Sequence, residues 1–535
     1  MTKPQGIASS SRPEEAARLA FMAPRVVRTL EAQLPGTPVR LIVAAAALVA
    51  VASAWFNVGF FSHDEHFQIL EFAWYKLGRT PGDALAWEFA ARMRPALQPW
   101  LAAGLFKGLE ALGLFTPIFA AFVLRVLSGL LAIWISLELC IRTLPSVRDA
   151  SLRRLLLPGM LFLWFLPYVH GRFASENWGG LLFFAGLCFV PDAENAPEGR
   201  RSTVRFVLAG LLWGAAFYCR FQVGFAIAGA GTWLLVVDRA PLRSIAVLAA
   251  AFLAACALNV ALDHWLYGEW VFTPYNYVYT NLVEGKAATF GTQPWWFYVA
   301  QMLALLVPPF SVLLVGLLIA SVWLCPRHVL VWVVVPFLLG HNLLGHKETR
   351  FLVPITYAIV PLLVLGADRL PETLRAKIAR WPNPRAARAA GRAFVALNLL
   401  ALAVMMFKPS SETAIVYERL YEESRKGPMV LYTGSLLPYS MAGNAVNFYR
   451  PENVTVKTLG SVSDLSMAMA ATPGRVFFFQ QSLQPPDWMA AGHIACTPVA
   501  RTLPLWSRRF NLNNWMSKMY QWSVFSVTTA ETGGC

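Results

Sequence analysis

Acidic and imidazole side chains crowd a short stretch that follows the first long apolar run, with the sequence SHDEHFQ over residues 62–68. Charged groups at the mouth of a membrane segment are costly, so they usually mark a functional site. A carboxylate held near apolar surface and near a second carboxylate has a raised proton affinity, so Asp64 and Glu65 are candidates for a general base. His63 and His66 could orient that base, bind phosphate or lie at the interface. The alternative is a polar loop at the end of a helix.

A second group of ionisable residues, HKETRF over residues 346–351, lies between two apolar runs. The side chains of Lys347 and Arg350 suit a phosphate group, because arginine offers two parallel donors and lysine a compact charge. The alternative is that these basic residues snorkel to the interface with Glu348 as their partner.

Further polar and aromatic residues follow other apolar runs. The loop from Asp263 to Trp296 mixes amides with flat aromatic faces, which suit sugars, although Tyr and Trp also form the ordinary aromatic belt of membrane proteins. The candidate substrate-binding residues outside the two groups above are Trp87, Glu88, Arg94, Arg172, Glu176, Tyr275 and Asn276, and Arg220 is a further cation.

The composition shows which elements must position these residues. Of the 535 residues 57% are hydrophobic and only 14% are charged, so the chain is predicted to be a polytopic α-helical membrane protein. Runs of about 20 apolar residues recur from Leu41 to Phe407 and indicate about eleven transmembrane helices. They are predicted near 41–61, 118–141, 155–169, 177–191, twice between 205 and 239, 244–263, 298–323, twice between 327 and 369, and 393–407. The first run lacks a cleavage site and is read as a retained anchor.

The distribution of Lys and Arg predicts the topology. Residues 1–40 are basic and are placed in the cytoplasm, so the first outer loop, about 62–117, lies on the opposite face. Within that loop, residues 97–115 are predicted to form an interfacial helix. The densely basic loops then all fall in the cytoplasm, and both ionisable groups fall on the other face. The net charge of +15 therefore reflects membrane topology and indicates no nucleic-acid partner.

The character of the chain changes after Lys408. Short apolar runs separated by Gly, Pro and Asn predict strands, so residues 408–535 are expected to form an extracytoplasmic α/β or mixed β domain. Cys496 and Cys535 lie in this tail and a disulfide between them is possible. No metal-type Cys/His spacing and no glycine-rich phosphate loop occur, so neither a metal nor another cofactor is expected. Because nucleotides are largely cytoplasmic, group transfer on the outer face would need a lipid-linked donor.

Several motifs in order resemble glycosyltransferase family 22, the Alg9-like and GPI-anchor mannosyltransferases. They are HDEHFQ at 63–68, WEF at 87–89 with RP at 94–95, DHWLYG at 263–268 with YN at 275–276, FG at 290–291, and HKETRF at 346–351. The resemblance covers residues of about 55 to 370. It implies a GT-C membrane fold over 41–407 and transfer of a sugar, in most members mannose, from a polyprenyl-phosphate donor to a glycan or glycolipid acceptor with inversion.

The resemblance also implies roles for individual residues. Asp64 would be the general base, and Glu65 would orient the acceptor or tune Asp64. Lys347 and Arg350, with His346 and Arg220, would hold the donor phosphate and stabilise its charge as it leaves. The sequence departs from the family pattern at Thr349, where an acidic residue is frequent, and around Arg172 and Glu176, which leaves the acceptor open.

Two other classes of function stay open at this point. A transporter or flippase for a lipid-linked or polar solute would need charges near the bilayer midplane and broken helices in paired halves. A scaffold that presents the tail domain is the third. The alanine-rich spans favour a bacterial inner membrane with the site in the periplasm, and a eukaryotic chain would place it in the endoplasmic reticulum membrane.

Overall fold

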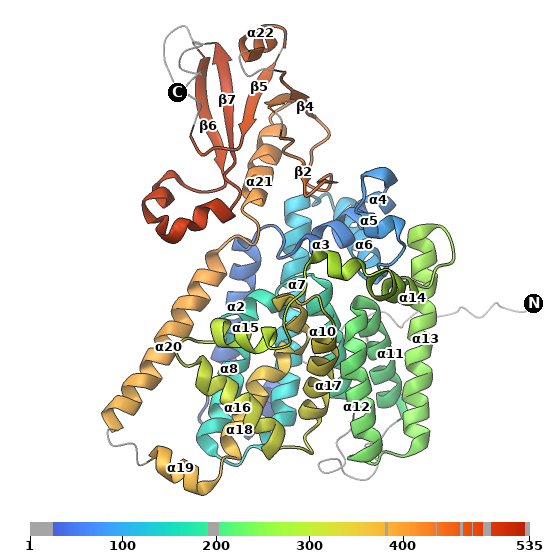
Figure 1. Ribbon diagram of the computed structural model, residues 1–535, viewed down its shortest axis with the longest axis vertical. Coiled ribbons are helices and arrows are strands. Elements are labelled where there is room, and N and C mark those ends of the chain that lie inside the picture. Colours follow the sequence, from blue (N-terminus) through green and yellow to red (C-terminus); the bar gives the residue numbers. More distant parts are fainter. Residues whose placement is uncertain are drawn as a thin grey trace, which may run out of the picture.

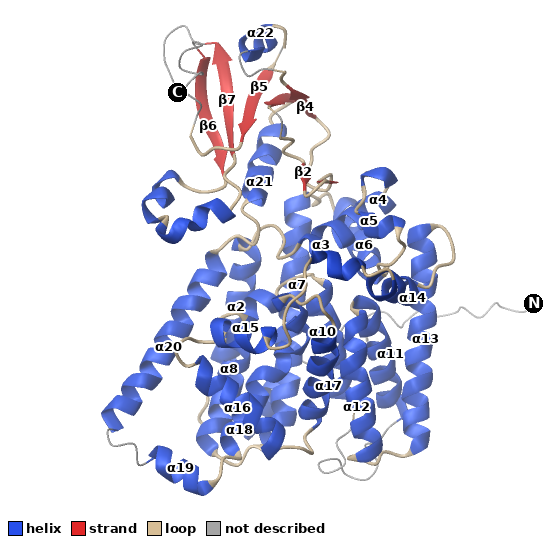
Figure 2. Cartoon of the chain, in the orientation of Figure 1, coloured by secondary structure: helices blue, strands red, loops and turns tan. Residues whose placement is uncertain are grey.

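The computed structural model describes residues 25–190, 203–379, 384–434, 436–460, 464–472, 474–484 and 494–529. Long helices form the larger part of the chain, and a smaller part that contains all the described strands stands at one end of the helices (Figures 1 and 2). Cys535 lies outside the described residues, so its disulfide with Cys496 stays a prediction.

Five helical segments of the described residues are long and apolar enough to cross a membrane, or up to six if one bent pair is counted. The chain is therefore an integral membrane protein. The five are α2 (Val39–Phe56), α7 (Pro117–Thr143), α13 (Leu242–Tyr267), the continuous pair η7 (Thr349–Ala358) and α18 (Ile359–Asp368), and α20 (Pro384–Phe407). The bent pair, α16 (Ser311–Leu324) and α17 (Val329–Leu343), turns by 114° at its break.

The remaining predicted spans coincide with shorter helices. These are α8 (Ala150–Phe162) with α9 (Leu166–His170), α10 (Ser175–Phe189), α11 (Thr203–Cys219), α12 (Gly224–Val236) and α15 (Phe297–Leu305). The predicted interfacial stretch forms α6 (Leu97–Ala111), and the basic linker after α18 holds α19 (Glu372–Ala379). The order of helices is thus as predicted, whereas several are shorter than a full membrane crossing of about 20 residues.

Local sequence explains where the helices begin and end. Thr116 accepts a hydrogen bond from the amide of Phe119 at 3.1 Å, and Pro117 occupies the first turn, so α7 begins there. At the other end of a helix, Gly268 adopts a left-handed conformation with φ of 76° and ends α13. The short helices α3 (His63–Glu65), η1 (His66–Leu70), α4 (Glu71–Lys76) and α5 (Trp87–Ala90) follow α2, and they are called the outer helices because they belong to the predicted first outer loop.

The C-terminal part is a mixed α/β unit, as predicted. Its five-stranded sheet has the order β4-β1-β5-β7-β6, with β1 (Met429–Thr433) parallel to β4 (Val454–Thr458) and β5 (Arg475–Gln480). Strand β7 (Ser523–Thr529) pairs antiparallel with β5 on one side and with β6 (Ile494–Arg501) on the other. A separate hairpin joins β2 (Ser440–Met441) to β3 (Asn444–Ala445), and the helices are α21 (Thr413–Ser424) and α22 (Leu465–Ala470).

One apolar core joins the two parts of the chain. It includes Phe67 of the outer helices, Phe106 of α6, and Phe448 and Trp522 of the C-terminal unit. The end of α20 is also tied to the end of α2, because the amide of Asn57 donates to the carbonyls of Met405 at 2.7 Å and of Lys408 at 2.6 Å. The C-terminal unit therefore packs directly on the loop that contains Asp64.

Candidate active site

The two ionisable groups of the sequence meet in one cavity of about 1230 Å³. Residues 61–64, 67 and 68 form one wall, and residues 344–351 form another. Residues 86–88, residues 220–222 just after α11, the end of α14 (Thr273–Val278) with the loop that follows it, and the hairpin β2–β3 also line the cavity. Segments far apart in the sequence thus converge on the same space.

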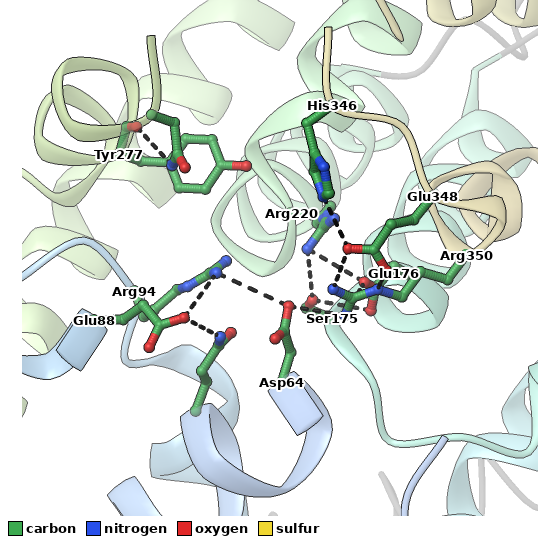
Figure 3. A network of polar contacts seen from close by, with 12 residues as sticks. Asp64, Glu88, Arg94, Ser175, Glu176, Arg220, Tyr277, His346, Glu348 and Arg350 are labelled. Atoms are coloured by element: carbon green, nitrogen blue, oxygen red, sulfur yellow. Dashed lines mark hydrogen bonds and ion pairs between the residues drawn. The ribbon is translucent and has the colours of Figure 1, made fainter. Parts of the chain in front are cut away.

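Asp64 lies where the charges of this cavity meet (Figure 3). Its Oδ2 is 2.8 Å from Nη1 of Arg350 and 3.9 Å from Nη2 of Arg94. Burial favours the neutral carboxyl, but the charges of Arg350, Arg94 and Arg220 outweigh it and lower the pKa of Asp64 to about 2. Asp64 is therefore ionised at neutral pH.

Arg350 binds three carboxylates. Besides Asp64 it contacts Glu348 at 2.6 Å and Glu176 at 3.3 Å, and Arg220 lies 3.3 Å from the same oxygen of Glu176. Glu176 is in the first turn of α10, where the helix dipole favours a negative charge. This network holds two guanidinium groups at the edge of the cavity.

Lys347 differs from these arginines because no carboxylate of the described residues lies within ion-pair distance of it. Its Nζ donates to the backbone carbonyls of Leu344 at 2.5 Å and Gln293 at 3.1 Å, and the residue is only 5% exposed. Its neighbour His346 lies between the carbonyl of Gly291 and the carboxylate of Glu348. A buried ammonium without a counter-ion is suited to bind an anion.

The opposite wall mixes amides, charges and rings. Glu88 accepts a hydrogen bond from Gln68 at 2.9 Å and lies 3.6 Å from Arg94, whose guanidinium is 5.6 Å from the centre of the Tyr277 ring. Trp87 lines the same cavity. Such a surface can bind the hydroxyls of a sugar and stack on its apolar face.

Nine of the predicted site residues line the cavity, namely His63, Asp64, Trp87, Glu88, Arg94, Arg220, His346, Lys347 and Arg350. Glu176 lies behind them, since it is buried and contacts the cavity only through Arg220 and Arg350. The roles of these residues toward substrate stay predictions.

The structure places two predicted site residues, Glu65 and Arg172, outside the lining of the cavity, so a direct contact of either side chain with a substrate in this cavity is not supported. Both residues are buried, and Oε2 of Glu65 lies 2.9 Å from Nη2 of Arg172. Arg172 also donates to the carbonyl of Asn57 at 2.9 Å, and Glu65 accepts from the amide of Phe61 at 2.7 Å. The pair therefore holds the loop that leads to Asp64, and neither side chain lines the cavity.

Three other predicted substrate contacts are also placed elsewhere. His66 is buried, 3.0 Å from Glu71, with its ring stacked on Tyr449. Tyr275 is 61% exposed, and the amide of Asn276 donates to the carbonyl of Arg92. None of the three is among the residues that line the cavity. They face other surfaces of the same short helices because adjacent helical residues point in different directions.

Sequence analysis did not assign several residues that line the cavity, namely Gln68, Gln222, Tyr277, Asn281, Glu348 and Asn444. Four of them, Gln68, Tyr277, Asn281 and Glu348, lie inside segments that were predicted to contribute to the site. For these four the segment was identified but the individual residue was not. No signal pointed to Asn444, which the fold of the C-terminal unit brings to the cavity. Among the described residues no three His, Cys, Asp or Glu side chains converge as they would around a metal ion.

Comparisons with known proteins agree with the motif resemblance. The profile of the Alg9-like mannosyltransferase family matches residues 41–426. GPI mannosyltransferase 3 of Yarrowia lipolytica is 27% identical over 344 residues, which are 63% of this chain and 63% of that protein. The chain thus spans slightly less than two thirds of that relative.

A shorter match and a solved structure add to this. The probable Dol-P-Man:Man(7)GlcNAc(2)-PP-Dol alpha-1,6-mannosyltransferase of Schizosaccharomyces pombe is 33% identical over 101 residues, 19% of this chain and 18% of that protein. The crystal structure of ArnT from Cupriavidus metallidurans bound to undecaprenyl phosphate superimposes with a TM-score of 0.52 at 14% identity, covering 92% of this chain and 99% of that one. This likeness establishes the GT-C fold.

Proposed function

The chain belongs to the Alg9-like mannosyltransferase family, and from that premise we propose that it is an inverting glycosyltransferase that moves mannose from a polyprenyl-phosphate donor to a glycan or glycolipid acceptor. The observation that carries the proposal is the cavity itself, in which Asp64 faces the cations Lys347 and Arg350. A base and a phosphate-binding group are the two functions that such a transfer requires.

In the proposed reaction the acceptor hydroxyl attacks the anomeric carbon of the donor sugar. Asp64 takes the proton of that hydroxyl as the new glycosidic bond forms. The bond between the anomeric carbon and the phosphate oxygen breaks, and the polyprenyl phosphate leaves with the electron pair. Lys347 and Arg350 stabilise the negative charge that develops on the phosphate.

The sugar and the donor class come from the relatives. The names of the Yarrowia and Schizosaccharomyces proteins specify mannosyl transfer, and the second name includes Dol-P-Man. The solved ArnT structure contains undecaprenyl phosphate, which is a polyprenyl phosphate like the lipid part of the proposed donor. We infer that the donor is a polyprenyl-phosphate mannose and a substrate, so no resident cofactor or nucleic acid takes part.

The charge distribution supports an extracytoplasmic position of the cavity, which would be the periplasm in a bacterial host and the lumen of the endoplasmic reticulum in a eukaryotic one. Its charged groups gather at one end of the helices, whereas a transporter would need charges near the bilayer midplane. No observation favours transport.

The test uses the full chain in nanodiscs with a radiolabelled polyprenyl-phosphate mannose and a glycolipid extract. Label is expected in the extract, with inversion at the anomeric carbon. Asp64→Asn should reduce transfer by at least about 100-fold, as loss of a general base does. Asp83→Asn, at an exposed acid of the same outer loop, serves as the control and should stay active. Retained transfer in Asp64→Asn would exclude Asp64 as the base.

A further inference from the structure

A hairpin of the C-terminal unit forms part of the wall of the active-site cavity. Its strands pair Ser440 with Ala445 and Met441 with Asn444, and its turn consists of Ala442 and Gly443 with φ of 50° and 81°. Ala442 and Asn444 line the cavity together with Asp64. The membrane helices alone therefore leave this cavity without one of its walls.

The hairpin is fixed firmly to the outer helices. Met441, Val446 and Phe448 are buried in the same core as Phe60 and Phe67, which flank Asp64 in the sequence. The close packing of such a core leaves little freedom for the residues that join it.

Polar and aromatic contacts add to this attachment. The amide of Phe448 donates to Oε1 of Glu71 at 2.8 Å, and the Phe448 ring packs against Trp74 with their centres 5.3 Å apart. The ring of Tyr449 stacks on His66. The position of the turn at the cavity is therefore fixed by the contacts of Met441, which precedes the turn, and of Phe448 and Tyr449, which follow it.

The hairpin packs in one apolar core with the residues that flank Asp64, and among the described residues this core includes none from the loop that carries Lys347 and Arg350. The acceptor hydroxyl must lie next to the base, whereas the donor phosphate must lie next to the cations. The side of the cavity that the hairpin shares with Asp64 is consequently the side on which the acceptor has to bind.

We propose that the hairpin is an acceptor subsite, in which the side-chain amide of Asn444 and the peptide groups of the turn bind hydroxyls of the acceptor glycan. An amide group both donates and accepts hydrogen bonds, as recognition of a hydroxyl requires. Asn444 is half-buried, and its amide donates one long hydrogen bond, 3.4 Å, to the carbonyl of Ala442. A hydroxyl at normal distance would displace this bond. The inference rests on the proposed function, because it assumes a sugar acceptor.

The first experiment separates acceptor binding from chemistry. Binding of α-mannobiose to the full chain in nanodiscs is followed by saturation-transfer NMR. Asn444→Ala should weaken it about 3- to 10-fold, as expected for loss of one or two hydrogen bonds. Ser440→Ala, in the same hairpin but outside the cavity lining, is the matched control and should bind normally. Equal binding by all three proteins would overturn the acceptor subsite.

The second experiment uses the size of the subsite. Ala442→Phe should reduce transfer to glycolipid acceptors at least about 10-fold by filling the acceptor side, while cleavage of polyprenyl-phosphate mannose by water continues. Unchanged selectivity between glycolipid and water would contradict the proposal. Failure of the wild-type chain to cleave the donor would instead contradict the proposed function, so the two failures are distinguishable.

Discussion

Oδ2 of Asp64 lies 2.8 Å from Nη1 of Arg350, so the proposed base and a proposed phosphate-binding cation neutralise each other before any substrate binds. Glu348 and Glu176 hold Arg350 from other sides. A donor phosphate that binds Arg350 has to compete with the carboxylate of Asp64. Donor binding would therefore weaken the contact that lowers the basicity of Asp64, and would prepare the base for the acceptor.

Asp64→Asn should consequently bind donor more tightly although its sugar transfer is strongly reduced. Removal of the competing anion leaves Arg350 with fewer partners, and we expect the dissociation constant of a short-chain polyprenyl-phosphate mannose to fall about 3- to 10-fold, which is about 1 kcal/mol. Equilibrium binding to the protein in nanodiscs measures this. Asp83→Asn should bind like the wild type, and weaker binding by Asp64→Asn would show that Asp64 does not compete with the donor.

The pH dependence of activity should change when Arg350 is replaced. The pKa of Asp64 is lowered to about 2, so protonation of Asp64 does not limit the wild type near neutral pH. In Arg350→Gln the effect of burial, which raises the pKa, is opposed by less positive charge. A larger share of Asp64 is then protonated as the pH falls, so the acidic limb of kcat/KM should move to higher pH.

This change is measured as the shape of the profile between about pH 4.5 and 8, normalised to each protein's maximum, since Arg350→Gln also weakens donor binding. Arg92→Gln is a suitable control because Arg92 is half exposed and pairs with Glu269. If the acidic limb of Arg350→Gln lies at the same pH as that of the wild type, Arg350 does not lower the pKa of Asp64 in the active enzyme.

Lys347→Ala should raise the KM for donor. A hydrogen bond to a charged group contributes about 1.5–3 kcal/mol, which corresponds to a 10- to 150-fold change in binding. Steady-state transfer at varied donor and saturating acceptor measures it. Lys107→Ala, at an exposed lysine of α6, should leave the donor KM unchanged. A rise in acceptor KM alone in Lys347→Ala would place the phosphate elsewhere.

The sequence predicted the helical architecture and the two ionisable groups that meet in the cavity for a physical reason. Apolar runs and basic loops determine the order and the orientation of membrane helices, so they also place Asp64 and Lys347 on one face. Only 14% of the residues are charged, and few of them fall on the face opposite the basic loops, so the candidates were easy to find.

The sequence could not show in which direction neighbouring side chains point. Asp64 and Glu65 are adjacent, yet one lines the cavity and the other pairs with Arg172 in the interior. The sequence also did not predict that Asn444 lines the cavity. That residue reaches the cavity through tertiary packing of the C-terminal unit, which begins after the last membrane helix.

The pair of Glu65 and Arg172 should contribute more to stability than an exposed pair does. Loss of one partner from a buried pair costs about 3–5 kcal/mol, because it leaves an uncompensated charge. Glu65→Gln should therefore lower the unfolding temperature in detergent clearly. Glu422→Gln breaks the exposed pair with Arg419 and should have an effect of about 0.5 kcal/mol or less.

The double variant Glu65→Gln with Arg172→Met tests the reason for that loss. It removes both charges and should recover part of the stability that Glu65→Gln loses, since no unpaired guanidinium remains. An unfolding temperature that is lower still in the double variant would mean that the hydrogen bonds of Arg172 to the backbone, and not the charge of its partner, dominate.

The packing of α12 on α17 offers a matched pair of substitutions at two glycines of one helix. A Cβ at Gly229 would lie 1.9 Å from the carbonyl oxygen of Trp332 in α17, whereas a Cβ at Gly231 would meet nothing within 4 Å. Gly229→Ala must push α17 away, and overpacking of this kind costs about 1–3 kcal/mol. Because α17 leads into the loop with Lys347 and Arg350, donor KM should rise together with the loss of thermal stability. Gly231→Ala should leave both quantities unchanged, and an equal effect of the two substitutions would exclude close contact between α12 and α17 as the cause.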